Sequence, residues 1–443
     1  MHHRFTHFYF LFFTIVSFAQ TGFELPQKKN RVVIPFKLVS NLIIIPLDVN
    51  GTKLNFLLDT GVSETLLFSL DETEQVKFEN IEKIKFTGLG NNEPFEGFKS
   101  SKNYVSGNGF VDADHTIYIV LDQNINISSQ VGFPINGIIG YHFFKNHPIE
   151  IKYKKNKIVV YDTITVVSKK NLAKYQKNPI VMEEGKPYIR TKVIFENQDS
   201  ELDAKLLIDT GNTDALWLFK EKNSAIAIPE NTYLDFLGKG FGGNIYGNRG
   251  RLKSFTFGNF TFNSPLISFP DSTATKGITM VKERVGSIGS EVMKRFNTIY
   301  DYENSMLYLD KNDNFILPFN FNMSGIDVQH DGLQWVEEKY EVNAVSSPVT
   351  FESEGNKITR NLKYRFVLKP SYSILSVRKE SPAAKAGLKE GDLIIKINSN
   401  YIYNLTLPQI KEILKSEEGR TIYIEVERKG VLIKTKFKLE KII

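Results

Sequence analysis

Two copies of one tripeptide carry the chemistry that this sequence suggests. Residues 59–61 and residues 209–211 both read Asp-Thr-Gly, and each copy follows an apolar segment typical of a buried strand. An ionised carboxylate at the end of a buried strand is costly unless another group pairs with it. Because each copy supplies one carboxylate, we expect Asp59 and Asp209 to lie together and to act on each other.

A close pair of carboxyl groups can hydrolyse a peptide bond. The two groups share a proton and titrate as a pair, because one ionises reluctantly beside the other. The ionised partner can take a proton from a bound water, which attacks the peptide carbonyl, while the protonated partner hydrogen-bonds to the carbonyl oxygen. Asp59 and Asp209 are therefore the predicted catalytic dyad, and the sequence leaves open which of them holds the proton.

The tripeptides belong to an internal duplication of roughly 150 residues. Asn-Gly-Ile-Ile-Gly at residues 136–140 returns as Val-Gly-Ser-Ile-Gly at 285–289, and the hairpin-like segment 149–162 returns at 297–310. Runs of β-branched residues between glycine turns indicate that each unit is mostly β. The duplication predicts two pseudo-equivalent lobes, residues 20–167 and residues 168–318.

This arrangement resembles the retropepsin-like lobe of the clan AA aspartic proteases, in which the Asp loop and a later apolar-apolar-Gly strand form one active-site unit. The chain looks like a two-lobed form of such an enzyme, and the resemblance covers about residues 30–312. It implies a mainly β fold with two facing lobes. It also implies that Thr60 and Thr210 cross-brace the two loops. Gly61 and Gly211 let the backbone approach the carboxylates, and we expect Ser63 and Thr213 to hydrogen-bond to the outer carboxylate oxygens.

One position in each loop departs from the pattern of that family. The residue after Asp-Thr-Gly is usually Ala or Ser there, and here it is Val62 in one copy and Asn212 in the other. These two side chains affect the geometry of the loops on the side that faces the substrate. The departure leaves open a second function, a catalytically silent, protease-like protein that binds peptides or serves as a scaffold.

Enzymes of this kind lower a glycine-bearing hairpin over the substrate to exclude water. Residues 88–98 and 238–247 stand in the right order to be such flaps, and ordinary hairpin tips are the alternative. The second segment also satisfies G-x-G-x-x-G, but no apolar helix follows it, so we expect no dinucleotide site. The expected flap glycines are Gly88, Gly90, Gly240, Gly242 and Gly243.

The C-terminal residues 319–443 predict an α+β domain. Ser-Pro-Ala-Ala-Lys-Ala-Gly-Leu at 381–388 reads as a helix with a Ser cap, Pro at the first position and a Gly stop. Thr406 and Gln409 form a capping box for a second helix with one apolar face. The run from 381 to 398 is similar to PDZ domains of the bacterial, permuted kind.

That resemblance implies a groove in which a peptide lies as an added strand, with its C-terminal carboxylate bound by backbone N–H groups. The expected peptide site comprises the loop Gly325, Ile326, Asp327 and Val328 and the helix residues Leu407 and Ile410. More than forty residues separate Val328 from Ile374, more than the family needs, and residues 353–357 read as an exposed loop. A PDZ fold that packs on the lobes without binding peptide is the alternative.

The N-terminus predicts export. Residues 1–19 hold Arg4 and three His before the apolar run 8–16, followed by small residues at positions 17 and 19, which is typical of a signal peptide cut before Gln20. An uncleaved anchor is the alternative, although the apolar run is short for a span. We expect a periplasmic or secreted protein with no stable membrane span after signal removal.

Composition excludes several classes of function. The chain has no cysteine, which excludes thiol chemistry and Cys-based metal sites. The net charge of +6 comes from scattered Lys and Arg with no basic block, so we expect no nucleic-acid partner. The sequence has no H-E-x-x-H, no close His pair outside the signal and no G-x-S-x-G, so neither a metal nor a cofactor is implied.

Together these features predict two retropepsin-like lobes followed by a PDZ domain. The predicted function is an exported aspartic-type endopeptidase whose PDZ module docks protein or peptide substrates, with C-terminal peptides as the ligands of that module.

Overall fold

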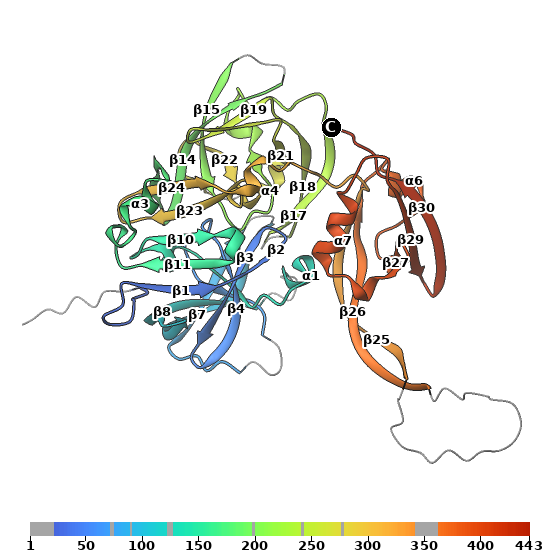
Figure 1. Cartoon of the computed structure of the whole chain (residues 1–443), viewed down its shortest axis with the longest axis horizontal. Helices are drawn as coiled ribbons and strands as arrows, with labels where there is room; N and C mark the ends of the chain where they lie inside the picture. The colour runs from blue at the N-terminus through green and yellow to red at the C-terminus, as the bar shows by residue number, and fades with distance from the viewer. Residues whose placement is uncertain are drawn as a thin grey trace, which may run out of the picture.

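The computed structural model describes residues 22–70, 75–88, 91–121, 127–196, 200–240, 243–275, 279–341 and 362–443. The expected signal peptide, the flap glycines Gly90 and Gly242, and the loop at 353–357 lie outside these residues. The described chain is mainly β. It forms two lobes built on the same plan, a sheet shared between them, and an α+β domain at the C-terminus (Figure 1).

The first lobe is an eight-stranded sheet in the order β2-β3-β4-β9-β5-β8-β7-β6. Asn50 and Gly51, both left-handed, turn β3 back into β4, as Asn-Gly turns do. β4 runs parallel to β9, with Leu58 beside Ile139. The strands are β2 (Lys37–Val39), β3 (Leu42–Val49), β4 (Thr52–Leu58), β5 (Leu66–Leu67), β6 (Ile81–Gly88), β7 (Asn91–Gly107), β8 (Phe110–Val120) and β9 (Gly137–Ile139).

The second lobe repeats this plan in a ten-stranded sheet. Its main path runs β17-β18-β21-β16-β22-β15-β14-β19-β20, and β13 pairs with β14. β15 runs parallel to β22, with Ile208 beside Ile288, as β4 runs beside β9. The strands are β13 (Val181–Glu183), β14 (Lys186–Ile194), β15 (Glu201–Ile208), β16 (Leu216–Leu218), β17 (Tyr233–Gly240), β18 (Gly243–Arg251), β19 (Ser254–Phe257), β20 (Phe260–Asn263), β21 (Leu266–Pro270) and β22 (Arg284–Ile288).

A six-stranded sheet joins the lobes. Its order is β1-β11-β10-β23-β24-β12, so the hairpin that ends one half pairs with the hairpin that ends the other, with Ile149 opposite Tyr300. In Figure 1 this sheet lies between the two lobes. The strands are β1 (Arg31–Pro35), β10 (Ile149–Lys152), β11 (Lys157–Tyr161), β12 (Gln176–Pro179), β23 (Phe296–Asp301) and β24 (Met306–Lys311).

The helices of this part of the chain are short. The α-helices are α1 (Ile127–Val131), α2 (Tyr141–Phe144), α3 (Lys169–Leu172), α4 (Ser272–Thr275) and α5 (Ser290–Met293), and the 3₁₀ helices are η1 (Tyr153–Lys155), η2 (Ile164–Val166), η3 (Lys220–Lys222) and η4 (Asp313–Ile316). Across the residues that the structure describes, no helix has the length and apolar character needed to cross a membrane.

Alternating apolar side chains of the sheets fill the core. Leu54, Phe56 and Leu58 of β4, and Leu206 and Ile208 of β15, are buried almost completely. Burial stabilises each such side chain by about 1.5–3 kcal/mol. The two Asp-Thr-Gly loops therefore begin from firmly packed strands.

The C-terminal domain has the predicted α+β form. Ser381 caps α6, and a capping box of Thr406 and Gln409 starts α7, as the sequence indicates. The sheet runs β25-β26-β27-β29-β30, with β28 beside β27. The elements are β25 (Ile326–Glu341), β26 (Leu362–Val377), α6 (Pro382–Lys385), β27 (Leu393–Ile397), β28 (Asn400–Tyr401), η5 (Ile402–Asn404), α7 (Leu407–Leu414), β29 (Thr421–Arg428) and β30 (Val431–Lys438).

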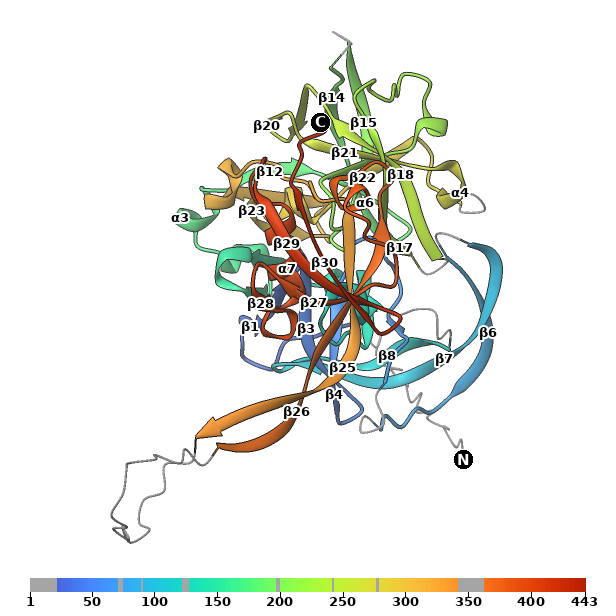
Figure 2. The same cartoon turned by 90° about the vertical axis from the view of Figure 1, so that its right-hand side faces the viewer.

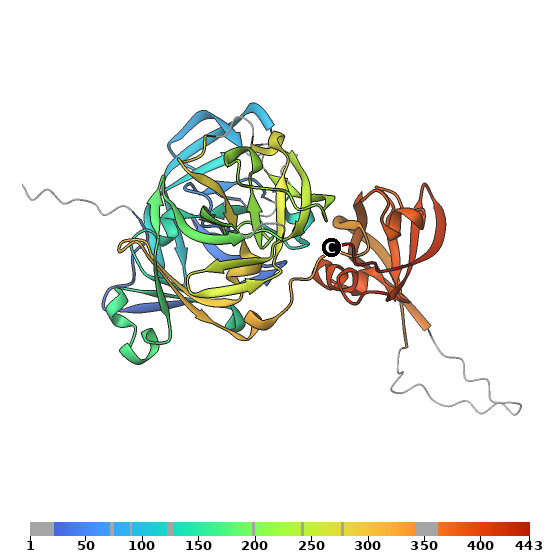
Figure 3. The ribbon, with the colours of Figure 1, turned by 90° about the horizontal axis from the view of Figure 1, so that it is seen from above.

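The long separation between Val328 and Ile374 has a structural reason. The two residues pair directly, because β25 and β26 are sixteen-residue strands that run side by side and extend past the domain as an arm (Figure 2). The C-terminal domain stands beside the lobes as a separate body, and the arm points away from them (Figure 3).

Candidate active site

Both Asp loops leave their strands in the same way. The N–H of Asp59 donates to the carbonyl of Ile139 over 2.9 Å, and the N–H of Asp209 donates to the carbonyl of Ile288 over 2.9 Å. Each loop is thus fixed to the apolar strand that pairs with its own strand. Asp59 is buried and Asp209 is half-buried.

The two carboxyl groups meet at the amide of Gly211. Its N–H lies 3.1 Å from Oδ1 of Asp59 and 3.1 Å from Oδ1 of Asp209, and a side-chain hydrogen bond links the two groups. Gly61 donates its N–H to Oδ1 of Asp59 over 2.7 Å, and Asn212 donates to Oδ1 of Asp209 over 3.0 Å. The structure therefore brings the predicted dyad together under three loop amides.

Both loop positions require glycine because of the space available. A Cβ on Gly211 would lie 2.1 Å from Oδ2 of Asp59, and a Cβ on Gly61 would lie 2.9 Å from Oδ1 of Asp209. Atoms that are not bonded do not approach this closely, so a side chain at either position would push the carboxyl groups aside. The backbone approach that the resemblance implies is present at both glycines.

Thr60 and Thr210 link the loops reciprocally. Oγ1 of Thr60 donates to the carbonyl of Ile208 over 2.7 Å, and Oγ1 of Thr210 donates to that of Leu58 over 2.9 Å. Each hydroxyl also accepts the N–H of the other threonine, at 3.0 and 3.1 Å. Because a buried group that loses its partner costs about 1–3 kcal/mol, this brace holds the two loops at one spacing.

Ser63 and Thr213 make different contacts from those expected. The Ser63 hydroxyl donates to the carbonyl of Glu184 over 2.5 Å, between β13 and β14. Thr213 takes part through its backbone carbonyl, which accepts from Nδ2 of Asn41 over 3.1 Å. The hydrogen bonds that the structure shows for Ser63 and Thr213 therefore run to the opposite lobe and not to the carboxyl groups of the dyad, which corrects the expectation.

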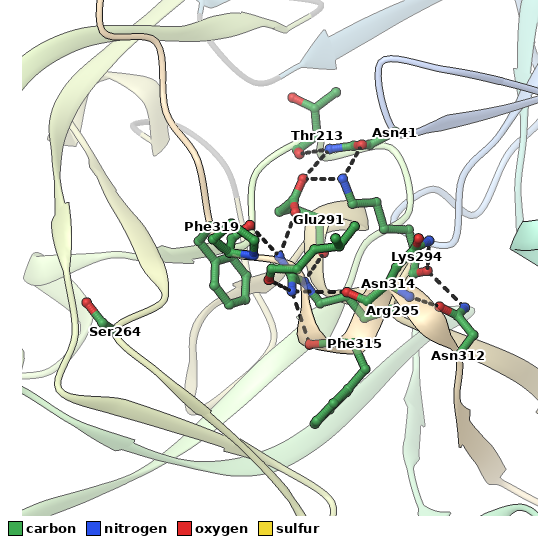
Figure 4. Close-up of polar contacts among 12 residues, drawn as sticks. Asn41, Thr213, Ser264, Glu291, Lys294, Arg295, Asn312, Asn314, Phe315 and Phe319 are labelled. Carbon is green, nitrogen blue, oxygen red and sulfur yellow. Dashed lines mark hydrogen bonds and ion pairs between the residues drawn. The ribbon is translucent and has the colours of Figure 1, made fainter. Parts of the chain in front are cut away.

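Asn41 belongs to a polar cluster that ties the lobes together beside the second Asp loop (Figure 4). Its side-chain amide donates to Oε2 of Glu291 over 2.8 Å and accepts from Nζ of Lys294 over 3.0 Å. Glu291 also pairs with Lys294 over 2.7 Å and with the buried Arg295 over 2.9 Å. Because Asn41 comes from the first lobe and the other residues from the second, the cluster fixes the loop of Thr213 against the first lobe.

Burial raises the pKa of both carboxyl groups, and the charge of Asp209 raises that of Asp59 further. For Asp59, burial and then the neighbouring Asp209 raise the pKa to about 8, against the amides of Gly61 and Gly211. For Asp209, burial raises the pKa, while the Arg284 guanidinium and the loop amides oppose the rise. A pair that cannot ionise twice near neutral pH holds one proton, which is the state that water activation requires.

The dyad opens into a cavity of about 1070 Å³. This is at the upper end of the range for ligand pockets, so the cavity is large enough for a peptide segment. The hairpin predicted to be the second flap lines it through Phe236, Leu237, Gly238, Lys239, Gly240 and Ile245.

The two predicted flaps are hairpins of the same build. β6 ends at Gly88, and β17 and β18 close with Gly240 opposite Gly243. Each hairpin has an irregular step in its pairing, at residues 86–88 in the first and at 236–238 in the second. The duplication therefore extends to the local shape of these hairpins.

Buried charges hold the base of the second flap. Arg249 of β18 pairs with Asp214 over 2.9 Å and with Asp235 of β17 over 3.0 Å. Asp214 also accepts from the indole N–H of Trp217 and the hydroxyl of Ser268. Although burial acts to raise the pKa of Asp214, Arg249 and these two hydrogen bonds bring it below its usual value.

The two departures from the family pattern differ in their surroundings. Val62 packs its side chain against the aliphatic cluster of the first lobe, and its carbonyl accepts the N–H of Tyr141 over 3.1 Å. Asn212 lines the cavity, and its Oδ1 accepts the N–H of Asp214 over 2.9 Å. Within the described part of the chain, Nδ2 of Asn212 is buried without a hydrogen-bond partner.

Comparison with known proteins settles the family of one part of the chain. The family model for the PDZ domain matches residues 373–428. This part of the chain is a PDZ domain. Among solved structures, the chain is similar to the aspartic proteinase from Irpex lacteus, at 15% sequence identity and a TM-score of 0.40, over 66% of this chain and 100% of that chain. No curated protein matches the sequence.

The PDZ domain borders the same cavity as the dyad. Asp327 and Val328 line it from β25, and Pro408, Lys411 and Lys415 line it from one face of α7. α7 turns its apolar face inward, as a half-buried amphipathic helix does. The other residues expected at the peptide site lie in the domain core, namely Ile326, Leu407 and Ile410, or in a tight turn against Ser381, namely Gly325.

Side chains of the domain itself occupy the expected carboxylate loop. Oδ1 of Asn322 accepts the N–H groups of Ser324 over 3.0 Å and of Gly325 over 3.3 Å. Oγ of Ser324 accepts the N–H of Ile326 over 3.2 Å. These amides belong to the loop that the resemblance assigns to a peptide carboxylate, so a peptide would have to displace Asn322.

A helix of the first lobe covers the PDZ groove. α1 packs against β25, and Nζ of Lys411 donates to the carbonyl of Gln130 over 2.9 Å. Gly132, just after α1, lies so close to α7 that a Cβ there would be 2.6 Å from Cβ of Leu407. In this structure α1 therefore lies where a peptide would enter between β25 and α7.

Sequence reasoning missed residues that shape the site, among them Asn41, Asp214, Arg249 and Arg284. Asn41 carries no signal of its own, because its partners lie far away in the chain. Arg284 does carry one: aligning the two halves of the duplication places it opposite Ile135 of the first half. A charged residue in one copy against an apolar residue in the other marks a position worth testing.

Proposed function

We propose that this protein is an aspartic-type endopeptidase that hydrolyses peptide bonds with a water activated by Asp59 and Asp209. The observation that carries the proposal is the Gly211 amide, which lies 3.1 Å from a carboxyl oxygen of each residue. Two carboxyl groups this close hold one proton between them. The cavity that opens from them supports the proposal, because it can take a peptide segment.

The reaction uses one ionised carboxyl group as the base and one protonated carboxyl group as the acid. The ionised carboxyl group takes a proton from water as the water oxygen bonds to the peptide carbon, and the other carboxyl group gives its proton to the carbonyl oxygen. The neutral gem-diol then collapses. The first carboxyl group protonates the nitrogen, the C–N bond breaks, and a gem-diol proton returns to the second group, so the dyad ends in its starting state.

The second flap supplies the water exclusion that this reaction needs. Phe236, Leu237 and Ile245 present apolar surface to the cavity. The flap base is anchored by the pairs of Arg249 with Asp214 and Asp235. The anchored hairpin then covers a substrate that lies in the cavity.

The PDZ domain serves this enzyme as a docking module for protein or peptide substrates. Its β25 and α7 border the dyad cavity, which supports this role, because a polypeptide held by the domain would lie beside the dyad. The pattern of residues 1–19 supports export to the periplasm or to the outside of the cell.

A catalytically silent peptide-binding protein is the second candidate. Two observations favour it: α1 covers the PDZ groove, and Val62 and Asn212 stand where the resembled family has small residues. This candidate predicts that peptides bind without turnover.

Cleavage of an unbiased peptide mixture tests both candidates. The full chain, Asp59→Asn and Asp209→Asn are incubated with the mixture from acid to neutral pH, and the products are identified by mass spectrometry. We expect cleavage by the parent that a statine-type transition-state mimic suppresses and that neither variant shows. A folded parent that binds peptides tightly and cleaves none would overturn the proposal in favour of the silent protein.

A further inference from the structure

The two lobes differ at matched positions beside the dyad. Phe56, three residues before Asp59, pairs with Gly137 of the neighbouring strand. Leu206, three residues before Asp209, pairs with Gly286 in the same way. Two positions before these glycines stand Ile135 and Arg284. The same plan therefore places an aliphatic side chain in one lobe and a guanidinium in the other.

Two further pairs of matched positions are also aliphatic in the first lobe and polar in the second. Leu57 pairs with Ile44 and Ile138, whereas Leu207 pairs with Tyr188 and Ser287. In the first lobe, Ile44, Ile135 and Ile138 belong to one buried aliphatic cluster. In the second lobe, the polar side chains of Tyr188, Arg284 and Ser287 occupy the matching positions.

Arg284 is held firmly in this place. Nη2 donates to Oγ of Ser287 over 2.9 Å, and Nε donates to the carbonyl of Gly286 over 3.2 Å. The guanidinium also interacts electrostatically with the Tyr188 hydroxyl and lies 5.6 Å from the ring centre of Phe219. These contacts direct the side chain along β22 toward the end of β15, where Asp209 follows, and Arg284 borders the cavity there.

A cation at this place acts unequally on the two carboxyl groups. Asp209 interacts with Arg284, whereas the charged neighbour of Asp59 is Asp209 itself. A half-buried guanidinium is costly without a nearby anion, and Asp209 supplies one. Other titratable or charged groups near this pair, among the residues that the structure describes, are Tyr302 beside Asp59, Tyr188 beside Arg284, Glu183 and Glu184 beside Tyr188, Lys205 paired with Glu183, and Glu283 beside Arg284 and paired with Arg190.

We propose that Arg284 makes the dyad unequal: it keeps Asp209 ionised, so that Asp59 carries the shared proton. The proposal rests on the proposed function. Asp209 is then the group that takes a proton from water, and Asp59 is the group that gives its proton to the carbonyl oxygen. Arg284 is a positioning residue, because it acts through Asp209 and not on the substrate.

Carboxyl NMR of the full chain tests this assignment without any need for turnover. The chain is labelled with ¹³C at the aspartate carboxyl carbons, and the two signals are assigned by their loss in Asp59→Asn and in Asp209→Asn. We expect Asp209 to titrate first and Asp59 last. In Arg284→Met the pKa of Asp209 should rise by about 1–2 units, because an opposite charge within a few ångströms lowers a carboxyl pKa by about that much.

Two control variants separate charge from shape. Arg284→Lys keeps the charge and should move the Asp209 titration less than Arg284→Met does. Lys192→Met removes an exposed ammonium of the same sheet, one that pairs with Glu201, and should move neither signal. If Arg284→Met fails to fold, Ser287→Ala and Tyr188→Phe loosen the guanidinium and should raise the pKa of Asp209 by a smaller amount.

The activity profile gives a second readout. The acidic limb of kcat/KM against pH should move to higher pH in Arg284→Met by the same amount as the Asp209 titration, and it should stay in place in Lys192→Met. An unchanged Asp209 titration in Arg284→Met, or in the two loosening variants, would overturn the assignment. So would a parent in which Asp59 titrates first. A parent that shows the expected titrations but cleaves no peptide would overturn the proposed function alone.

Discussion

Gly211 of the second lobe points its N–H at Asp59 of the first over 3.1 Å, and a Cβ on Gly211 would lie 2.1 Å from the same carboxyl group. This contact means that the dyad exists only when the two lobes are in register. The threonine brace and the Asn41 cluster maintain that register from both sides of the loops.

Gly211→Ala is expected to displace the dyad while leaving most of the fold intact. A methyl group cannot occupy a site 2.1 Å from a carboxyl oxygen, so the Asp59 carboxyl group must move. Misplacing a catalytic group by about 1 Å can cost about 100-fold in rate. We expect a loss of kcat of that order, measured on a peptide that the parent cleaves. A variant with parental kcat would show that the close contact has no part in the reaction.

Thr60→Val and Thr210→Val should each lower the free energy of unfolding by about 1–3 kcal/mol, because each leaves a buried carbonyl and a buried N–H without partners. The double variant should lose less than the sum of the single losses, since the two residues bond to each other. Urea unfolding measures these values. Thr256→Val, at an exposed pair of hydroxyl groups on β19 and β20, serves as the control and should change stability little. Additive losses at Thr60 and Thr210 would contradict a reciprocal brace.

The dyad should make stability fall as the pH rises. The pKa of Asp59 is about 8 in the folded chain, against an ordinary pKa of 3.8 for the same group in the unfolded chain, so the folded state binds more protons between these limits. Stability contributed by the protonated group is thus fully present below pH 3.8 and is lost as the pH rises toward 8. Asp59→Asn removes a slope of up to about 1.4 kcal/mol per pH unit. Chemical denaturation of both proteins from about pH 4 to about pH 8 checks this, and parallel curves would contradict it.

Much of the fold depends on near neighbours and was predictable for that reason. The Asn50-Gly51 turn, the strand that precedes it and the Thr406–Gln409 capping box each depend on residues a few positions apart. The duplication placed the flaps and the Asp loops in order, because each half repeats the same local signals. The meeting of Asp59 and Asp209 followed from a physical argument about the cost of a buried charge.

Contacts between the lobes could not be predicted in the same way. Ser63 donates to Glu184 and Thr213 accepts from Asn41, and nothing near these residues in the sequence indicates those partners. The packing of α1 on the PDZ domain is of the same kind, since Gln130 and Lys411 are 281 positions apart. The arm of β25 and β26 was missed because the two strands pair residues that are far apart in the sequence, such as Ile326 with Val377.

Lys411→Met should loosen α1 from the PDZ groove. The variant loses the donor to the carbonyl of Gln130, a hydrogen bond worth about 1 kcal/mol. Hydrogen exchange in α1 should become faster, and C-terminal peptides should bind up to about fivefold more tightly. Lys438→Met, an exposed change on β30 of the same domain, is the matched control and should alter neither value. Unchanged exchange and affinity in Lys411→Met would show that α1 does not compete with a peptide.

The most direct test of the central claim is kcat/KM for the best-cleaved peptide with the parent, Asp59→Asn, Asp209→Asn and Asp203→Asn. Asp203 is exposed on β15, the strand that leads to Asp209, and it controls for the substitution itself. We predict a fall of at least about a thousandfold in each dyad variant and little change in Asp203→Asn. A folded Asp59→Asn or Asp209→Asn that keeps substantial activity would contradict the account.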